Sequence, residues 1–199
     1  MKTKILSLVL SLIAITGLTK NTHAAVTADY TILNDIKAIN KIEIHGNVEL
    51  FISDDVTEQV TVYNKYYSES ALVQSKNGVL RISSYTADKL VVWVTSENLH
   101  SISAYDNAEV RSFGDINKIE FNIDLHDNAS ARLKFNNTYS AYVTLRDHAA
   151  IELSGIVNAF GMNRSTGSTV INTNFSVGHN TENKIISQPG KKEVLAGLE

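Results

Sequence analysis

Apolar and polar residues alternate in three similar segments near the middle of the chain. The segments span residues 102–110, 123–131 and 143–151, and each carries an aspartate at its centre. These aspartates, which are 21 and then 20 residues apart, are Asp106, Asp127 and Asp147. Apolar residues stand at even offsets from each aspartate, and they share one face because strand side chains point alternately to opposite sides. Each segment therefore predicts a strand, a polar corner and a second strand.

A repeat of about 20 residues is typical of stacked coils. A strand advances about 3.3 Å per residue, so about five or six residues form one side of a coil. Stacking would pair each strand in parallel with the equivalent strand of the next coil and bury the apolar columns between the sides. The sequence thus predicts an all-β solenoid, a parallel β-helix with coils of about 20 residues. An antiparallel sandwich or meander is the alternative that the alternation leaves open.

The N-terminus has the pattern of a signal peptide. Two lysines precede an apolar run at residues 5–15, and small residues follow at Thr22 and Ala24. This pattern predicts a signal peptide over residues 1–24 and an exported protein of the periplasm or cell surface. The apolar run is too short to span a membrane comfortably, so we do not expect an integral membrane protein. The remaining residues, 25–199, have the length of a single domain.

Composition narrows the possible partners. The chain has no cysteine, which excludes disulfides and a cysteine-linked lipid anchor. Removing the predicted signal peptide removes three lysines and no acidic residue, so the formal net charge changes from -3 to -6. A mildly acidic chain is a poor ligand for nucleic acid or an anionic membrane. No phosphate loop, nucleophile elbow or cofactor fingerprint is present, so we expect no cofactor.

The segment before the three repeats is less regular. The corner pattern recurs at Gly46, 60 residues before Asp106, which is three periods of 20. Between them, Asn77-Gly78 predicts a hairpin turn. Residues 90–95 are apolar on both faces, which predicts the most buried strand, with Trp93 in the core. Beyond the three repeats the pattern decays, as expected of a terminal coil. The residues that would continue the core there are Phe160, Met162 and Val170.

These residues resemble a known family. Residues 44–50, 77–82 and 92–99, followed by the corner at Asp106, resemble in order and pattern the putative auto-transporter adhesin head GIN domain family, DUF2807. The resemblance covers residues 36–177. It implies an exported bacterial envelope protein with a right-handed β-helical fold and an adhesin-like, non-catalytic role. It supplies no catalytic residues. The chain has Asp-Asn or Asp-His at corners where the family often has Ser-Gly or Gly-Asp.

The polar corners could bind a metal ion. If the coils stack, His126, Asp127, Asp147 and His148 come close together, and two imidazoles with two carboxylates could hold a divalent metal. The column that Asp127 and Asp147 form with Asp106 could instead bind calcium, although it offers only one carboxylate per coil. The alternative is structural, because aspartate at a corner accepts hydrogen bonds from the turn backbone and tolerates left-handed conformations. We adopt the structural interpretation and predict no metal ligand.

A polysaccharide-degrading enzyme on a β-helix is the alternative function. Such an enzyme needs carboxylates and basic residues that converge in a groove. The candidates are Glu109, Asp124, Arg132, Arg146 and Glu152. Their spacing does not require acid–base chemistry, and charged residues at odd offsets are typical of a solvated face. We therefore predict no catalytic residues.

Aromatic residues concentrate before the regular repeats. Exposed aromatic side chains bind sugar faces and protein partners well. We predict that Tyr63, Tyr66 and Tyr67 form a binding patch for an envelope glycan or a surface protein. Open solenoid edges also favour self-association, so we expect that the chain can form a homo-oligomer.

Overall fold

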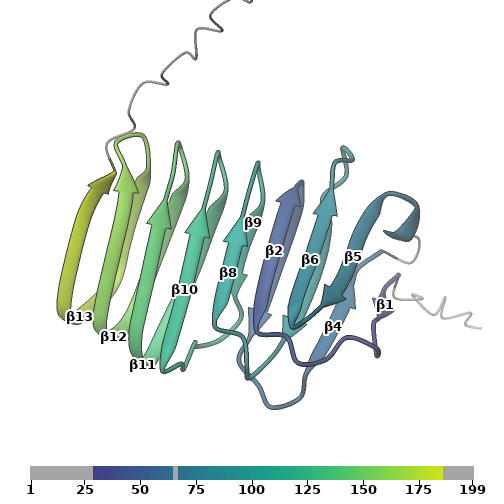
Figure 1. Ribbon diagram of the computed structural model, residues 1–199, viewed down its shortest axis with the longest axis horizontal. Coiled ribbons are helices and arrows are strands. Elements are labelled where there is room, and N and C mark those ends of the chain that lie inside the picture. Colours follow the sequence, from purple (N-terminus) through teal and green to yellow (C-terminus); the bar gives the residue numbers. More distant parts are fainter. Residues whose placement is uncertain (1–28, 65–66, 186–199) are drawn as a thin grey trace, which may run out of the picture.

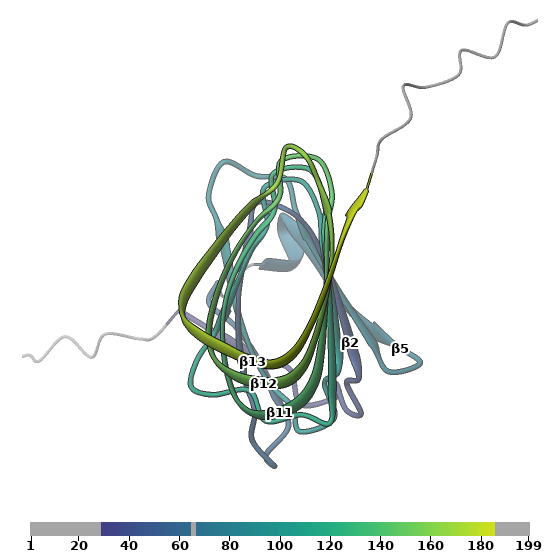
Figure 2. The same ribbon diagram turned by 90° about the vertical axis from the view of Figure 1, so that its left-hand side faces the viewer.

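The computed structural model describes residues 29–64 and 67–185, and these residues form an all-β fold. Thirteen strands within the described ranges belong to one sheet, which curls so that its two halves lie opposite each other (Figures 1 and 2). Among the described residues, one 3-10 turn at Tyr67–Glu69 lies between the strands. The prediction of an all-β fold is therefore confirmed.

We call the half of the sheet that faces the viewer in Figure 1 the front face and the opposite half the rear face. The front face contains, in spatial order, β5 (Ala71–Lys76), β6 (Val79–Ser84), β2 (Lys41–Gly46), β8 (Ser101–Ala104) and β10 (Glu120–Leu125). The rear face contains β1 (Thr31–Ile32), β4 (Gln59–Val62), β7 (Leu90–Thr95), β3 (Val48–Ser53) and β9 (Glu109–Ser112). Three long strands bend and contribute to both faces: β11 (Ser130–Leu145), β12 (Ala150–Ser165) and β13 (Thr169–Ile185).

Equivalent positions of the three sequence repeats lie side by side. On the front face Ile102 pairs in parallel with Ile123, and Ile123 pairs in parallel with Val143. On the rear face Ala131 pairs in the same way with Ile151. The chain thus returns to the same position on the neighbouring strand after 20 or 21 residues in this region. The antiparallel alternative is wrong for the repeats.

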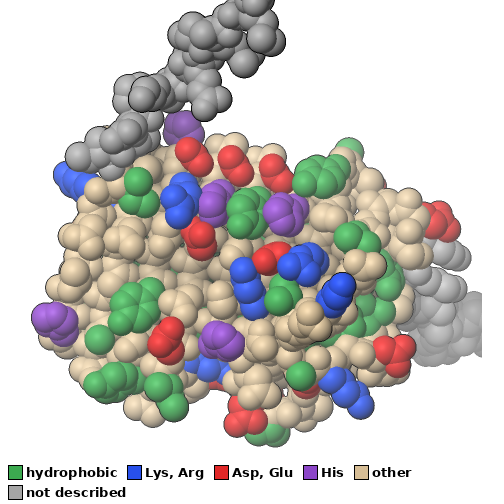
Figure 3. Space-filling model, viewed as in Figure 1, with side chains coloured by type: hydrophobic (Ala, Val, Ile, Leu, Met, Phe, Trp, Pro, Cys, Tyr) green, Lys and Arg blue, Asp and Glu red, His purple; other side chains and the backbone are tan. Residues whose placement is uncertain are grey.

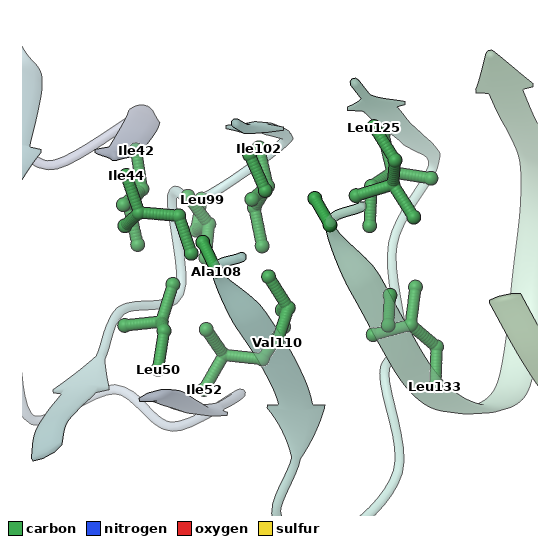
Figure 4. Close-up of a cluster of buried hydrophobic side chains, with 14 of the residues drawn as sticks. Ile42, Ile44, Leu50, Ile52, Leu99, Ile102, Ala108, Val110, Leu125 and Leu133 are labelled. Carbon is green, nitrogen blue, oxygen red and sulfur yellow. The ribbon is translucent and has the colours of Figure 1, made fainter. Parts of the chain in front are cut away.

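The core lies between the two faces. Inward side chains alternate with outward ones, so each strand contributes every second residue to the interior. Figure 4 shows Ile44 and Ile102 from the front face directed toward Leu50 and Val110 from the rear face, and all four are essentially buried. Burying an aliphatic side chain of this size stabilises the fold by about 1.5–3 kcal/mol. These columns are what hold the two faces together.

The corners have left-handed backbone geometry. The φ angles are 62° at Asp106, 55° at Asp127 and 53° at Asp147, and Gly46 has φ 80°. Most L-residues avoid this region, whereas aspartate and glycine enter it with little strain. The residue types at the corners therefore follow from the backbone that the turn requires.

The long strands bend from the rear face to the front face at a second set of left-handed positions. In β11 the bend lies beside Asn137, with φ 56°, and in β12 it lies at Gly155, with φ 92°. A Cβ atom at Gly155 would lie 1.8 Å from the carbonyl oxygen of Phe135 on the neighbouring strand. Only glycine therefore allows β12 to pack against β11 at this bend.

The stacking order differs from the expectation for Gly46. The strands on either side of Gly46, β2 and β3, pair directly with β8 and β9 rather than lying three coils away. The amide of Gly46 donates a 2.9 Å hydrogen bond to Oδ2 of Asp106. The intervening residues 54–100 pack on the other edge of the same two strands, where β6 pairs with β2 and β7 pairs with β3. The three-period prediction is wrong because both edges of β2 and β3 take partners.

The irregular segment gives one confirmed prediction and two corrections. Asn77 and Gly78, both with positive φ, connect β5 and β6 as an antiparallel hairpin, as predicted. Trp93 was expected in the core, but it lies on the outward side of β7 and is only partly buried. The prediction that residues 90–95 form the most buried strand is also wrong, because their side chains alternate between buried and half-buried like those of β2 and β3.

The terminal strand β13 is largely exposed. Phe160 and Met162 on β12 continue the core, as predicted, and Val170 packs partly buried against it. The predicted signal peptide, residues 1–24, lies outside the described residues. Within the described ranges, the structure contains no helix with the length and apolar character needed to cross a membrane.

Candidate binding surface on the rear face

Five aromatic side chains form a connected cluster on the outside of the rear face. We call this the aromatic cluster; its members are Tyr30, Phe51, Tyr63, Trp93 and Phe113. The ring centroid of Trp93 lies 4.9 Å from that of Phe51 and 4.8 Å from that of Phe113. Tyr63 lies 6.4 Å from Trp93 and 6.0 Å from Tyr30. These distances are typical of favourable ring contacts, so the cluster is a packed unit.

The cluster remains open to solvent. Phe113 is 60% exposed, Tyr63 is 49% exposed and Tyr30 is 43% exposed. Trp93 and Phe51 are half-buried and stand in register on the adjacent strands β7 and β3. The ring of Trp93 also contacts those of Tyr63 and Phe113. An exposed ring held against a rigid sheet loses little conformational freedom on binding, which favours recognition. The arrangement is therefore suited to contact a ligand.

A straight column of outward side chains continues from the aromatic cluster along the rear face. Phe51 on β3 is in register with Arg111 on β9, Arg111 with Arg132 on β11, and Arg132 with Glu152 on β12. We call Trp93, Phe51, Arg111, Arg132 and Glu152 the axial column. The column passes from aromatic rings to planar charged groups without leaving one line on the sheet.

Ion pairs order the charged part of the column. The guanidinium of Arg111 lies 2.8 Å from a carboxylate oxygen of Glu49 and 3.1 Å from one of Glu109. Nε of Arg132 lies 2.6 Å from Oε2 of Glu152. Nζ of Lys89 lies 2.6 Å from Oε1 of Glu109. These six residues carry three positive and three negative charges, so the surface is charged but formally neutral.

The carboxylate of Glu109 is held ionised by its neighbours. Its hydrogen bond from Lys89, aided by the hydrogen bond and charge of Arg111, lowers the pKa of Glu109 below its ordinary value of 4.5, although partial burial acts in the opposite direction. A carboxyl group that is fully ionised at neutral pH is a poor general acid. The observed pairing suits hydrogen bonding to a ligand better than proton transfer.

A shallow groove runs beside the charged part of the column. It has a volume of about 170 Å³ and is floored by the small side chains of Ser130 and Ala150, which stand in register on β11 and β12. Arg111, Arg132 and Glu152 line its wall. The groove exists because small residues follow one another where the adjacent column carries long ones.

The tyrosines of the predicted binding patch lie in different surroundings. Tyr63 belongs to the aromatic cluster, whereas Tyr67 packs partly buried against the hydrophobic core. Tyr66 lies outside the described residues. Tyr30, Phe51 and Phe113 also belong to the aromatic cluster, although the sequence pattern does not single them out. The alternation of side chains along each strand could have found two of the rings. Phe51 and Trp93 stand at odd-numbered positions in strands whose even-numbered positions face the core.

The aspartate corners serve the backbone. The amide of Asp106 donates to Oδ2 of Asp127 at 3.1 Å, and the amide of Asp127 donates to Oδ2 of Asp147 at 3.4 Å. Figure 3 shows a row of acidic side chains along the upper edge of the front face. Nowhere in residues 29–64 and 67–185 do three or more histidine, aspartate or glutamate side chains form a group that could hold a metal ion. The contacts support the structural interpretation of the corners.

The histidines considered for metal binding have different neighbours. The ring of His126 stacks on Tyr105 at 4.4 Å, and Tyr105 stacks on His45 at 4.4 Å. Nε2 of His126 also lies 3.0 Å from Oδ2 of Asp124. His148 is on the other side of the corner, and its amide donates to the carbonyl of Asp127 at 2.9 Å.

The charged residues considered for catalysis are divided between the two faces. Asp124 and Arg146 form a 3.6 Å ion pair on the front face. Glu109, Arg132 and Glu152 line the groove on the rear face. The fold therefore does not bring the five candidates together in one groove.

Comparisons with known proteins identify relatives of the fold. The family model described as "Putative auto-transporter adhesin, head GIN domain" matches residues 38–187, more than half of the chain. None of the curated proteins matches the sequence.

The similar solved structures include three that cover most of the chain. A putative adhesin from Parabacteroides merdae has a TM-score of 0.55 at 13% identity, covering 78% of this chain and 76% of its own. A putative adhesin from Parabacteroides distasonis has a TM-score of 0.57 at 14% identity, covering 78% and 77%. A putative lipid binding protein from the same species has a TM-score of 0.60 at 10% identity, covering 78% and 77%. At these identities the likeness establishes the shared fold alone.

Proposed function

The chain belongs to the putative auto-transporter adhesin, head GIN domain family, and on this premise we propose that it is an exported, adhesin-like surface module that binds without catalysis. The observation that carries the proposal is the aromatic cluster, which presents three exposed rings on a rigid sheet. Large aromatic side chains contribute disproportionately to recognition surfaces. We propose that the strands wind as a right-handed β-helix with coils of about 20 residues, since parallel strand connections are almost always right-handed.

The location follows from the same proposal. We propose that residues 1–24 direct export and are then removed, so that the remaining chain works in the periplasm or on the cell surface. Cell fractionation tests this part: the full chain should leave the cytoplasm, and a chain without residues 1–24 should remain there. Cytoplasmic retention of the full chain would contradict it.

The non-catalytic part of the proposal rests on the state of the carboxylates. On the rear face, Glu109 and Glu152 are both ion-paired with basic side chains. A glycoside hydrolase needs one carboxylic acid with a raised pKa to protonate the leaving group, whereas the pKa of Glu109 is lowered. Incubation with polysaccharides, followed by measurement of new reducing ends, should give no signal above buffer. A signal that disappears in Glu109→Gln or Glu152→Gln would support the enzyme instead.

Adhesion itself can be measured with the protein on beads. Beads coated with the chain lacking residues 1–24 should be retained by immobilised bacterial envelopes. The variant Phe113→Ala, which removes the most exposed ring of the cluster, should reduce retention. The matched control is Tyr142→Ala, which removes a 50% exposed ring from the outside of the front face. Equal retention of beads with and without the protein would refute the proposed function.

Self-association remains a prediction. The edge strand β13 is the last of the described strands on both faces, and it pairs only with β12. Its exposed residues include several asparagines, which keep this edge hydrated. Light scattering on the purified chain would measure the oligomeric state.

A further inference from the structure

We propose that the rear face binds an extended, uncharged polysaccharide chain along the axial column, with sugar rings on the aromatic cluster and hydroxyl groups on the ion-paired arginines and glutamates. This inference rests on the proposed function and names the ligand class for the same surface. Four features of the surface carry it. They are the straight axial column, the narrow groove beside it, the balance of positive and negative charges, and the strand backbones, which are already hydrogen-bonded within the sheet.

The axial column has the length and direction of a linear ligand. Trp93, Phe51, Arg111, Arg132 and Glu152 come from five adjacent strands in register. Adjacent strands are about 4.8 Å apart, so the column extends for about 19 Å. A polymer that lies across the strands would contact each member in turn. Such a polymer would span several consecutive sugar units.

The groove is too narrow for a helical partner. Side chains on the same face of a strand repeat every two residues, which is about 6.7 Å. The floor formed by Ser130 and Ala150 is one such column wide, whereas an α-helix with its side chains is about 10–12 Å across. The groove therefore matches a single extended chain.

The charges favour an uncharged ligand with many hydroxyl groups. Lys89, Arg111 and Arg132 are balanced by Glu49, Glu109 and Glu152, and the ion pairs among them occupy only part of their donor and acceptor capacity. The side chain of Arg132 is 65% exposed, so its remaining N–H groups are accessible. A polyanion would meet the three carboxylates, and a polycation would meet the three basic groups. Hydroxyl groups can donate hydrogen bonds to the carboxylates and accept hydrogen bonds from the basic groups.

The backbone of this face offers nothing to an extended peptide. Strands β7, β3, β9, β11 and β12 each pair with a neighbour on both sides, so their amides and carbonyls are already used in the sheet. A peptide that binds by strand addition needs a free edge instead. Recognition on the rear face must therefore come from side chains, and ring stacking with side-chain hydrogen bonds is how sugars are recognised.

The proposal can be tested with defined polysaccharides. The chain lacking residues 1–24 would be titrated by calorimetry with mannan, β-1,3-glucan, xyloglucan and cellohexaose, and with polygalacturonate as the anionic comparison. At least one uncharged glycan should bind more tightly than polygalacturonate. Phe113→Ala and Arg132→Gln should each weaken that binding at least tenfold. Phe113→Tyr, which keeps an aromatic ring, should retain most of the affinity.

Matched variants on the front face provide the control. Tyr142→Ala and Arg146→Gln remove one exposed ring and one exposed cation from the opposite side, and they should leave the affinity unchanged. Thermal melting checks that every variant is folded. The inference is overturned if no uncharged glycan binds, if polygalacturonate binds best, or if variants of both faces lose affinity equally.

The bead assay separates this inference from the proposed function. If beads adhere to envelopes, and periodate oxidation of envelope sugars abolishes adhesion, both stand. If adhesion survives periodate but is lost after protease treatment of the envelopes, the partner is a protein, and the glycan inference falls while the adhesin-like function stands. If beads do not adhere at all, the proposed function is refuted, and the inference that rests on it is refuted as well.

Discussion

Asp127 combines two structural roles that substitutions can separate. Its backbone is left-handed, with φ 55°, and its carboxylate Oδ2 accepts the amide of Asp106 at 3.1 Å. Asp127→Ala removes both the acceptor and the residue type that tolerates this φ. Asp127→Gly removes the acceptor alone, and Asp127→Asn keeps both features while removing the charge.

The two contributions have different expected magnitudes. A left-handed backbone costs an ordinary residue such as alanine about 1–2 kcal/mol. An intramolecular hydrogen bond contributes about 0.5–1.5 kcal/mol net, and the lower half of that range applies here because the site is exposed. We therefore expect Asp127→Ala to lower the free energy of unfolding by about 2 kcal/mol and Asp127→Gly by about 1 kcal/mol. Asp127→Asn should change it by less than about 0.5 kcal/mol, since an amide oxygen can accept the same hydrogen bond and asparagine tolerates positive φ.

Thermal and urea denaturation of the four proteins measure these differences. For a domain of this size about 1 kcal/mol corresponds to roughly 2–4 °C in Tm, so Asp127→Ala should melt roughly 4–8 °C below the parent protein. If Asp127→Ala and Asp127→Gly have equal stability, the left-handed corner does not limit the choice of residue, and the reasoning is refuted. Millimolar Ca²⁺ should leave all four Tm values unchanged, because a bound ion would raise the Tm of the parent protein.

Three further predictions concern packing and charge. Gly155→Ala should destabilise the fold by several times more than an exposed Gly→Ala change, because the new Cβ would meet the carbonyl oxygen of Phe135. Urea denaturation measures the difference. Gly114→Ala is the control, because Gly114 also has a positive φ but no atom lies within 4 Å of its Cβ position. Leu133→Ala in the core should cost about 2–5 kcal/mol and lower Tm, with the far-ultraviolet circular dichroism of the folded protein unchanged. The hydrogen bond from Lys41 and the charge of Arg81 lower the pKa of Glu43 below 4.5, so its stabilisation is present above that pH and lost as the pH falls through the lower folded pKa. Glu43→Gln should therefore flatten the acid limb of a plot of Tm against pH, and an unchanged limb would contradict the assignment.

The sequence alone was sufficient for the local units of the fold. Alternation around Asp106, Asp127 and Asp147 predicted strands on both sides of each corner, and the structure places strands there in parallel register. Asn77-Gly78 likewise predicted its hairpin. These features depend on a few neighbouring residues, because side-chain alternation and left-handed turns are properties of short stretches of backbone.

The order of the strands in space depends on distant residues. Spacing suggested that Gly46 lies three coils from Asp106, yet the two corners share a hydrogen bond. The spacing counts residues, but it does not say on which edge of β2 and β3 the intervening segment packs. That choice depends on which edge completes the sheet and buries the most apolar surface, which only the assembled structure decides.

The binding surface shows the same division. The sequence by itself indicated that Arg132 and Glu152 are solvated, because they stand at odd offsets in the repeats. It predicted Trp93 in the core, and it did not single out Phe51 or Arg111. Tertiary stacking decided that these five side chains fall in one line, because strands from residues 48–53, 90–95, 109–112, 130–145 and 150–165 pair in register. Hydrogen bonding between strands sets that register, and the partners of a strand are chosen by the whole fold rather than by its own residues.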